Sequence, residues 1–231
     1  MSRLVIVDLD GTLLRGGSEI RFIAHLAATR RIGISALLRS VAFAIRFAPR
    51  FGRDVWKKNK AYLAGLPRTQ VEKWGRSFAS ECLAGLLRQS VLDRIARHRA
   101  GGDVIILMTG TPEFLARPLA EVIGAELCIA TQCRDQDGGY VASPPLRHPF
   151  ANEKLKLARE TAARLGVSLA ECTAYADSRD DIELLSEVGT PIAVAPDREL
   201  ARHAREHGWE IISDPQIRPF RRKFVWAGER S

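Results

Sequence analysis

Pairs of carboxylates occur at two widely separated places in this sequence, and each pair directly follows a short apolar run. The first pair is Asp8 and Asp10, and the second is Asp177 and Asp181. In such a pair, one carboxylate can attack as a nucleophile while its neighbour gives and takes protons. Clustered carboxylates also repel one another, which a bound cation offsets, and oxygen ligands suit Mg²⁺. The alternatives are an Asx-type turn at the first pair and a solvated acidic loop at the second.

A threonine motif and a lysine lie between the two acidic pairs. Thr109-Gly110-Thr111 offers a hydroxyl and backbone N–H groups at a predicted helix N-terminus, where phosphate oxygens are well held. A capping threonine without a ligand explains the same residues. Lys154 lies near the start of another predicted helix, where the helix dipole mildly disfavours a cation. Lys156 is the competing candidate, and most helix lysines are only solvated.

The polar residues follow apolar runs that predict buried parallel strands. From residue 91 onward, predicted strands and helices alternate, which indicates a parallel α/β sheet with right-handed crossovers. Ligands bind beyond the strand C-termini of such sheets. The predicted strands are 4–7, 104–108, 173–176, 191–195 and 210–212, and the predicted helices are 91–100, 112–123, 152–165, 180–188 and 198–207. A strand pair is predicted at 127–131 and 140–142, around the turn Asp137-Gly138-Gly139.

The region between the first two motifs differs in character from the rest of the chain. Residues 19–89 predict helices, with breaks near Gly33, Pro49–Gly52 and Gly65–Pro67. Residues 15–75 hold 13 Lys or Arg against 3 Asp or Glu, and the whole chain has a net charge of +8. We therefore expect an anionic partner for this segment.

A helix predicted over residues 34–53 gathers basic side chains on one side. Arg39, Arg46, Arg50 and Arg53 fall within a sector of roughly 60°, and Pro49 is expected to break or kink the helix. Three interpretations stay open. Arg39 and Arg46 can bind a second anionic group of a substrate, or the stripe can lie on an anionic membrane surface, or it is the solvated side of an ordinary helix.

Composition excludes several classes of protein. The chain has 231 residues, 46% of them hydrophobic and 27% charged, which predicts one large domain or a domain with a smaller insert and excludes collagen and coiled coil. The four cysteines form no CxxC pair, so we expect a reduced, cytoplasmic protein without a zinc knuckle. The apolar stretch 32–51 is too charged for a membrane span. No nucleic-acid module accompanies the basic-aromatic cluster at 218–226, so nucleic acid is not an expected partner.

Taken in order, the motifs resemble the haloacid dehalogenase-like (HAD) superfamily of phosphohydrolases. They are DxDGT from residue 8, an apolar strand ending in Thr109, a later lysine, and DxxxD from residue 177. The long gap between the first two motifs leaves room for a helical cap, as in the phosphoserine-phosphatase-like branch. The resemblance implies an α/β fold with a Rossmann-like parallel sheet formed by 1–14 and 80–231, and an inserted all-helical C1-type cap at 15–79.

The resemblance also implies roles for the motif residues. Asp8 would be the nucleophile that forms an aspartyl-phosphate, and Asp10 would be the general acid for the leaving alkoxide and then the base for water. Dehalogenases lack an acid at the second position, because halide leaves without a proton, whereas a phosphate ester benefits from one. The presence of Asp10 therefore favours a phosphatase over a dehalogenase.

Phosphate and metal binding would fall to the remaining motif residues. Thr109 and the Gly110 amide would hold phosphoryl oxygens, and Lys154 would neutralise charge beside the nucleophile. The implied cofactor is Mg²⁺, because this cation and the lysine offset the repulsion between a carboxylate and a phosphate. Its ligands would be Asp8, the backbone carbonyl of Asp10 and Asp177, with Asp181 in an outer position.

One departure puts phosphoserine itself in doubt as the substrate. Phosphoserine phosphatases usually carry a glutamate at the place of Gly17, whereas here Glu19 stands two residues further on. We expect a magnesium-dependent phosphomonoesterase that acts on a small organic phosphate. The alternatives are a lipid-phosphate phosphatase at the inner face of a membrane, similar to phosphatidylglycerophosphate phosphatases, a phosphotransferase or mutase, and a non-catalytic adaptor.

Overall fold

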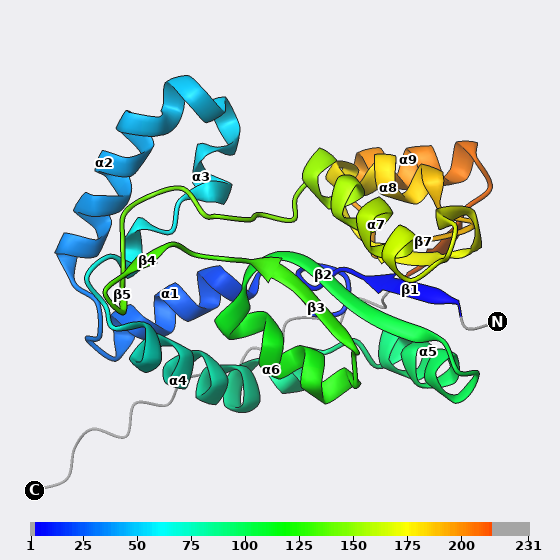
Figure 1. Cartoon of the computed structure of the whole chain (residues 1–231), viewed down its shortest axis with the longest axis horizontal. Helices are drawn as coiled ribbons and strands as arrows, with labels where there is room; N and C mark the ends of the chain where they lie inside the picture. Colours follow the sequence, from blue (N-terminus) through cyan, green and yellow to red (C-terminus); the bar gives the residue numbers. More distant parts are fainter. Residues whose placement is uncertain (1–2, 214–231) are drawn as a thin grey trace, which may run out of the picture.

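The centre of the molecule is a six-stranded, wholly parallel sheet, which the computed structural model describes within residues 3–213 (Figure 1). The strand order is β3-β2-β1-β6-β7-β8. The strands are β1 (Leu4–Val7), β2 (Val104–Pro112), β3 (Leu127–Thr131), β6 (Thr173–Ala176), β7 (Thr190–Val194) and β8 (Glu210–Ile212). The chain moves outward from β1 in one direction and later in the other, so the carboxyl end of β1 is the topological switch point where ligands bind in such sheets.

Helices cover both faces of this sheet. On one face lie α5 (Gln89–Ala100) and α6 (Glu113–Ile123), and on the other lie α7 (Asn152–Arg164), α8 (Ile182–Glu187) and α9 (Arg198–Glu206) (Figure 1). Side chains alternate along β1: Val5 and Val7 belong to the core beneath α5 and α6, while Leu4 and Ile6 belong to the other core. Burial on both faces explains why the strand is an uninterrupted aliphatic run. The predicted α/β fold class is confirmed.

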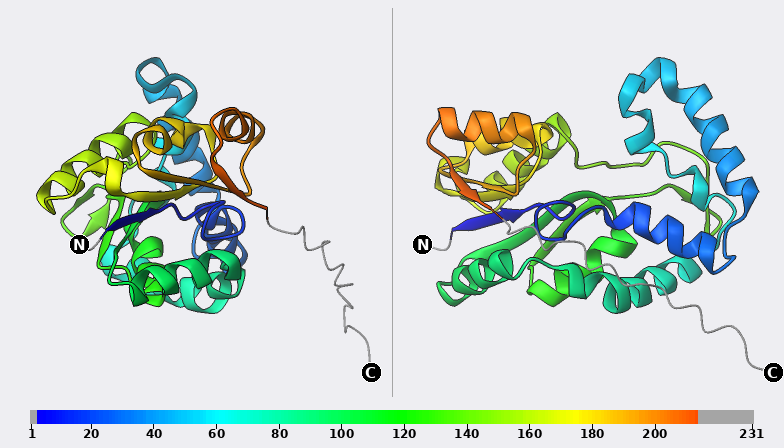
Figure 2. Two further views of the ribbon diagram at one scale, coloured as in Figure 1. Left: turned by 90° about the vertical axis from the view of Figure 1, so that its right-hand side faces the viewer. Right: turned by 180° about the vertical axis from the view of Figure 1, so that it is seen from behind.

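The chain between β1 and α5 is helical, as predicted, but its helices lie in two different places. They are α1 (Ser18–Ala28), α2 (Ile34–Phe51), α3 (Val55–Lys58) and α4 (Arg68–Phe78). Helices α1 and α4 share the core of α6, where the ring of Phe22 lies 5.4 Å from those of Phe78 and Phe114. Helices α2 and α3 project from that layer (Figure 2) and bury a small cluster of their own around Phe43 and Val55. The division at residues 15 and 79 stays a prediction.

Short helices join the longer ones. They are three-residue 3₁₀ turns at Gly52–Asp54, Ala61–Leu63, Ala84–Leu86, Leu169–Glu171 and Arg179–Asp181, and a π turn at Ala79–Leu83. The helix predicted over 34–53 ends at Phe51 instead, because Gly52 takes a φ of +53° directly after the last turn, which contains Pro49. No helix within residues 3–213 is long and apolar enough to cross a membrane. The basic-aromatic cluster at 218–226 lies outside the described residues.

The predicted pairing of 127–131 with 140–142 is wrong. Strand β3 instead extends the main sheet, in parallel register with β2, because its apolar side chains are buried there. The turn signal at Asp137-Gly138 does form a hairpin, between β4 (Asp135–Gln136) and β5 (Gly139–Tyr140). This hairpin attaches to the start of α4: the Tyr140 amide donates to the Leu66 carbonyl and the Arg68 amide to that of Gly138.

Candidate active site

The first acidic motif leaves the end of β1 in a tight loop that lies directly against the second. Gly11 has a φ of +86°, and a Cβ added there would lie 1.9 Å from the Oδ2 of Asp177. Only glycine therefore permits this backbone conformation and this approach together. The Thr12 hydroxyl donates to Asp177 Oδ1 at 3.1 Å. Acids that are far apart in the sequence are thus brought to the same edge of the sheet, as predicted from the strand ends.

Lys154 is the lysine of the site. Its Nζ lies 2.7 Å from Asp8 Oδ1 and 2.8 Å from Asp181 Oδ1, and the residue is only 3% exposed. Lys154 lies in the first turn of helix α7, which begins at Asn152, and this turn places the lysine amine next to the end of β1. The competing candidate, Lys156, is exposed and lies 3.8 Å from Glu160 on the outer side of the same helix.

The pKa values of the acids show how strongly negative charge is concentrated here. Burial, together with the nearby charges of Asp181 and Asp177, raises the pKa of Asp8 to about 8 despite the opposing effect of Lys154. Burial and the charge of Asp181 raise the pKa of Asp177 to about 6. Burial would lower the pKa of Lys154, but the two carboxylates it contacts raise it above its ordinary value. A cation bound beside Asp8 and Asp177 would relieve this repulsion.

The residues present fit a magnesium ion. Asp8 and Asp177 supply carboxylate oxygens at the lip of one cavity, and the backbone carbonyl of Asp10 lies in the loop between them. Hard oxygen ligands are the donor set that Mg²⁺ prefers. Asp181 contacts Lys154 through Oδ1, so its carboxylate also holds the lysine in place.

The Asp10 carboxylate is held by three donors. Its Oδ1 accepts from the Ser18 amide at 2.8 Å, and its Oδ2 accepts from the Ser18 hydroxyl at 3.0 Å and the Thr111 hydroxyl at 2.8 Å. Burial raises the pKa of Asp10, although these hydrogen bonds oppose the shift. An acid that is fixed in direction and easier to protonate than usual is suited to proton transfer.

The threonine motif lines the opposite wall. Strand β2 continues past the predicted end at 108, and Thr109 and Gly110 stand beside the acids. The Thr109 hydroxyl accepts from the Thr111 amide at 3.1 Å, which closes the turn. The Gly110 carbonyl accepts from the Thr131 hydroxyl at 2.6 Å, and that hydroxyl lies 2.8 Å from the Nδ1 of His148. The loop that would hold the phosphate is thus braced from β3.

These groups open on a cavity of about 270 Å³ whose walls come from the core and the insert together. Its lining comprises Asp8, Asp10, Glu19, Lys57, Lys60, Thr109, Gly110, Thr111, His148, Pro149, Phe150, Lys154, Asp177, Ser178 and Asp181. All the predicted core-motif residues are therefore together. Arg39 and Arg46, predicted to bind substrate, are not among the lining residues. They belong to α2, which projects away from the sheet (Figure 2).

Besides Lys154, the cations that line the cavity are Lys57 and Lys60 from the segment after α2, neither of which was predicted as a site residue. Lys60 is 4% exposed and forms an ion pair with Glu19, which also accepts from the Tyr62 hydroxyl at 2.9 Å. Lys57 lies 2.7 Å from Asp180 and 3.7 Å from the ring centroid of Phe150, so it links the insert to the core. Glu19 is thus neutralised by partners from the insert.

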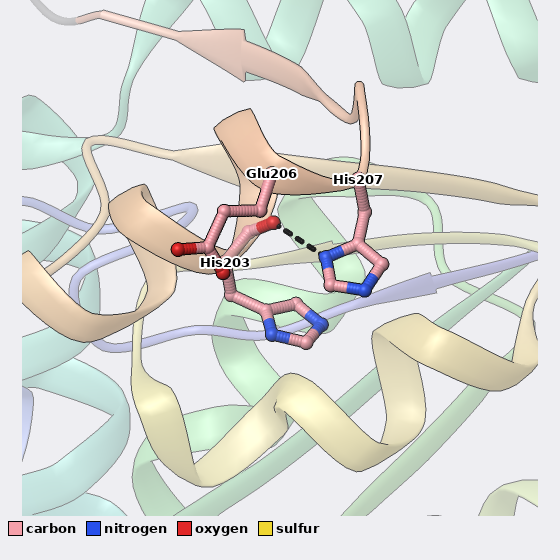
Figure 3. A group of neighbouring side chains, drawn as sticks. All are labelled: His203, Glu206 and His207. Carbon is pink, nitrogen blue, oxygen red and sulfur yellow. Dashed lines mark hydrogen bonds between the residues drawn. The ribbon is translucent and has the colours of Figure 1, made fainter.

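A second group of possible metal ligands lies on the last turn of α9 (Figure 3). Within residues 3–213, His203, Glu206 and His207 are the one group of three such side chains whose ligand atoms all lie within 4.8 Å of one another. The two rings stack at a centroid distance of 4.0 Å with planes 19° apart, so their lone pairs run side by side and do not converge. None of the three lines the cavity. This group plays no part in the site.

A parallel α/β sheet with buried acids and a lysine at its switch point is an architecture typical of α/β enzymes. Residues 5–186 match the family model of haloacid dehalogenase-like hydrolases, and the chain belongs to this family. It is 32% identical over 211 residues to the inhibition of morphological differentiation protein of Streptomyces azureus, covering 89% of this chain and 76% of that protein. It is 30% identical to phosphoserine phosphatase SerB1 of Mycobacterium tuberculosis, covering 88% and 68%.

Further comparisons support the same family assignment. A histidinol-phosphatase of Neisseria meningitidis is 27% identical over 227 residues, covering 92% of this chain and 99% of its own. A Bordetella pertussis protein of unknown function superposes with a TM-score of 0.78 at 27% identity over 92% of this chain and 99% of that one. A substrate-bound phosphoserine phosphatase, at 18% identity, shares the fold with a TM-score of 0.63 over 92% and 93%. The predicted superfamily and its phosphoserine-phosphatase-like branch are confirmed.

Proposed function

We propose that this protein is a magnesium-dependent phosphomonoesterase that hydrolyses a small organic phosphate through an aspartyl-phosphate. The observation that carries the proposal is the different treatment of two acids on one cavity. Asp8 is paired with Lys154, while Asp10 is fixed by the hydroxyls of Ser18 and Thr111 and by the Ser18 amide. A nucleophile next to a cation and a separate, oriented proton donor are what a phosphate ester requires.

The reaction follows from these positions in two steps. An Asp8 oxygen attacks phosphorus, the bond from phosphorus to the ester oxygen breaks, and Asp10 gives its proton to the leaving alkoxide. Asp10 then takes a proton from water, whose oxygen attacks the phosphorus of the aspartyl-phosphate, and Asp8 and inorganic phosphate are released. Thr109 and the Gly110 amide hold the phosphoryl oxygens, and Lys154 offsets charge that develops beside Asp8.

Magnesium would be held by Asp8, the Asp10 carbonyl and Asp177, and would supply a Lewis acid that lowers the repulsion between carboxylate and phosphate. The close packing of Gly11 against Asp177 holds this metal-ligand candidate next to the loop that carries Asp8 and Asp10. Burial and the charges of Asp181 and Asp177 raise the pKa of Asp8 even beside Lys154, an effect that a second positive charge would offset.

Asp8→Asn is the direct test, because the amide is close in shape to the carboxylate but is not a nucleophile. We expect turnover of p-nitrophenyl phosphate to fall by on the order of 10³-fold or more, with an unchanged circular dichroism spectrum. A folded variant that keeps the wild-type rate would contradict the proposal. A wild-type protein that hydrolyses no phosphate ester in the presence of Mg²⁺ would favour the adaptor, and phosphate transfer to added alcohol would indicate a phosphotransferase.

The pairing of Glu19 narrows the choice of substrate. Glu19 is paired with Lys60 and Tyr62, so it is not a free anion for the ammonium group of an amino-acid phosphate. We propose that phosphoserine is a poor substrate, although relatives of this chain are named phosphoserine phosphatase and histidinol-phosphatase. Rates measured on phosphoserine, histidinol phosphate, sugar phosphates, nucleotides and lysophospholipids, each with Mg²⁺, test this directly.

A second candidate function, action on a lipid phosphate at a membrane surface, is favoured by one specific observation. Helix α2 exposes a line of large aliphatic side chains spanning about 100° of its circumference. They are Ile34, Leu37, Leu38, Val41 and Ile45, which are 42–73% exposed. Arg46 and Arg50 lie on another side of the helix, about 80° and 120° around from Leu38 at the edge of this apolar face. A helix with one apolar and one basic side is suited to an anionic interface.

Liposome flotation decides between the two candidates. Vesicles with anionic lipid should carry the protein to the top of the gradient at low salt, and Leu38→Glu combined with Ile45→Glu should abolish flotation while leaving p-nitrophenyl phosphate turnover unchanged. Failure of the wild-type protein to float at low salt would rule out the membrane function and leave the small-molecule phosphatase.

A further inference from the structure

His148 is a polar side chain of the cavity that the proposed reaction does not use. It is 4% exposed, and it lies in the segment between β5 and α7. Its Nδ1 is 2.8 Å from the Thr131 hydroxyl oxygen, while its Nε2 is buried and has no hydrogen-bond partner among residues 3–213. Buried polar atoms are nearly always paired with protein, ligand or ordered water, so an unpaired one in a ligand cavity marks a place where a ligand atom can replace a water.

The hydrogen-bond pattern fixes the tautomer of this ring. The Thr131 hydroxyl lies 2.6 Å from the Gly110 carbonyl oxygen, which has no hydrogen, so the hydroxyl must donate there. The same hydroxyl oxygen can then only accept from His148, which places a hydrogen on Nδ1. Burial, with the nearby charges of Lys60, Lys58 and Lys57, lowers the pKa of His148 to about 3, so the ring is neutral. Its Nε2 therefore carries a lone pair and is an acceptor.

The acceptor lies beside the loop that would hold the phosphate. A Cβ added at Gly110 would be 3.4 Å from His148 Cε1 and 4.0 Å from Nε2. A group that Nε2 contacts would therefore lie next to the phosphoryl group, where the alcohol part of the ester begins. A second phosphate or a carboxylate offers only acceptors there and would face the lone pair.

The surrounding charges select the type of donor. Lys57 and Lys60 line the same cavity, and although each is also paired with a carboxylate, their positive charges lower the pKa of His148. An ammonium group is disfavoured next to these lysines, whereas a hydroxyl carries no charge. Carbonyl and carboxylate groups lack the hydrogen that Nε2 requires. A hydroxyl near the ester is the group that satisfies both conditions.

We propose that His148 Nε2 accepts a hydrogen bond from a hydroxyl on the alcohol part of the substrate, so that the substrate class is the hydroxylated alkyl phosphates. This rests on the proposed phosphatase function. It makes His148 a specificity-determining residue, with Thr131 as the residue that positions its ring. Neither residue belongs to the acidic, threonine or lysine motifs of the site.

Three matched substrates test the proposal: ethyl phosphate, 2-hydroxyethyl phosphate and 2-aminoethyl phosphate. Wild-type kcat/KM should be about tenfold higher for the hydroxyl compound than for ethyl phosphate, the size of one net hydrogen bond, and the amine should show no such gain. The informative variant is His148→Asn, whose side-chain amide can still donate to Thr131 but has no atom at the position of Nε2. It should hydrolyse ethyl phosphate and show equal kcat/KM, within about twofold, for the hydroxyl compound.

A binding measurement separates this proposal from the proposed function. In a ¹⁵N-labelled protein, the His148 ring nitrogens, assigned by their loss in His148→Asn, should report a hydrogen on Nδ1 at pH 6. The Nε2 resonance should shift when 2-hydroxyethyl phosphate is added and stay in place with ethyl phosphate. No shift, or a variant that keeps the preference for the hydroxyl compound, overturns the proposal. Absence of all phosphatase activity refutes the proposed function, while the resonance still decides the hydrogen bond.

Discussion

The amine of Lys154 lies 2.7 Å from the Oδ1 of Asp8, and this buried contact joins the start of α7 to the end of β1. The same amine contacts Asp181, so one cation compensates two buried carboxylates. Buried ion pairs can often be replaced by well-packed apolar groups without loss of stability when all partners are replaced together. We therefore infer that this contact serves charge compensation in the site more than the stability of the fold.

Replacing Lys154 with methionine removes the charge and keeps most of the side-chain volume. We expect kcat for p-nitrophenyl phosphate to fall by about 10²–10³-fold, as on removal of a group that stabilises charge in the transition state. Thermal unfolding should also show destabilisation, because Asp8 and Asp181 are left without their partner. Lys156→Met is the control on the exposed side of the same helix and should change neither quantity. A folded Lys154→Met protein with near wild-type kcat would contradict the assigned role.

Asp10→Asn should separate proton transfer from nucleophilic attack. The amide keeps the place of the carboxylate but cannot protonate an alkoxide, a contribution of about 10²–10⁴-fold. The loss should be large for an alkyl phosphate and much smaller for p-nitrophenyl phosphate, whose phenolate leaves without a proton. The quantity compared is the rate constant of the first step, in which the alcohol or phenol is released, measured in a rapid-quench experiment. Equal losses for both esters would show that Asp10 is not the acid.

Much of the fold and most of the core site could be predicted because both follow from strand ends. The carboxyl ends of parallel strands meet at one edge, so Asp8, Thr109 and Asp177 had to approach each other once β1, β2 and β6 were recognised. The pairing of β3 was missed because a turn signal indicates a hairpin without saying which strands it joins. The local pattern of Leu127–Thr131 fits either arrangement.

The walls of the cavity could not be predicted in the same way. Lys60 and His148 line the cavity, and Ser18 holds Asp10. They come from the residue before a 3₁₀ turn, from a loop and from a helix start, whose positions depend on tertiary packing and have no period in the sequence. Arg39 and Arg46 attracted attention because helical periodicity groups them, but periodicity says which residues share a side of a helix and not what that side faces. The two insert lysines that line the cavity, Lys57 and Lys60, follow α2 in the chain.

Gly11→Ala should weaken magnesium binding at the site more than it destabilises the fold. The added Cβ would overlap Asp177 Oδ2 at 1.9 Å, so the carboxylate must move. We expect the Mg²⁺ concentration for half-maximal activity to rise by about 10–100-fold, the usual effect of disturbing the support of a metal ligand. Gly102→Ala is a matched control: its φ of +82° carries the same backbone strain, yet nothing lies within 4 Å of its Cβ. Magnesium titrations of the two variants should therefore differ, and similar curves would contradict the packing argument.

The buried, neutral state of His148 should make folding stability depend on pH. Its pKa is lowered to about 3 in the folded protein, first by burial and then by the lysines around it, whereas an unfolded histidine titrates near 6.5. The unfolded chain therefore binds the additional proton as pH falls below 6.5, and the folded state loses stability by about 1–2 kcal/mol between pH 6.5 and 5. Urea unfolding of wild type and His148→Asn at both pH values measures this. His148→Asn should lose about 1–2 kcal/mol less stability than the wild type between the two pH values. The control His207→Asn changes an exposed histidine and should behave as the wild type. A His148→Asn protein with the wild-type pH dependence would show that the ring is not held neutral.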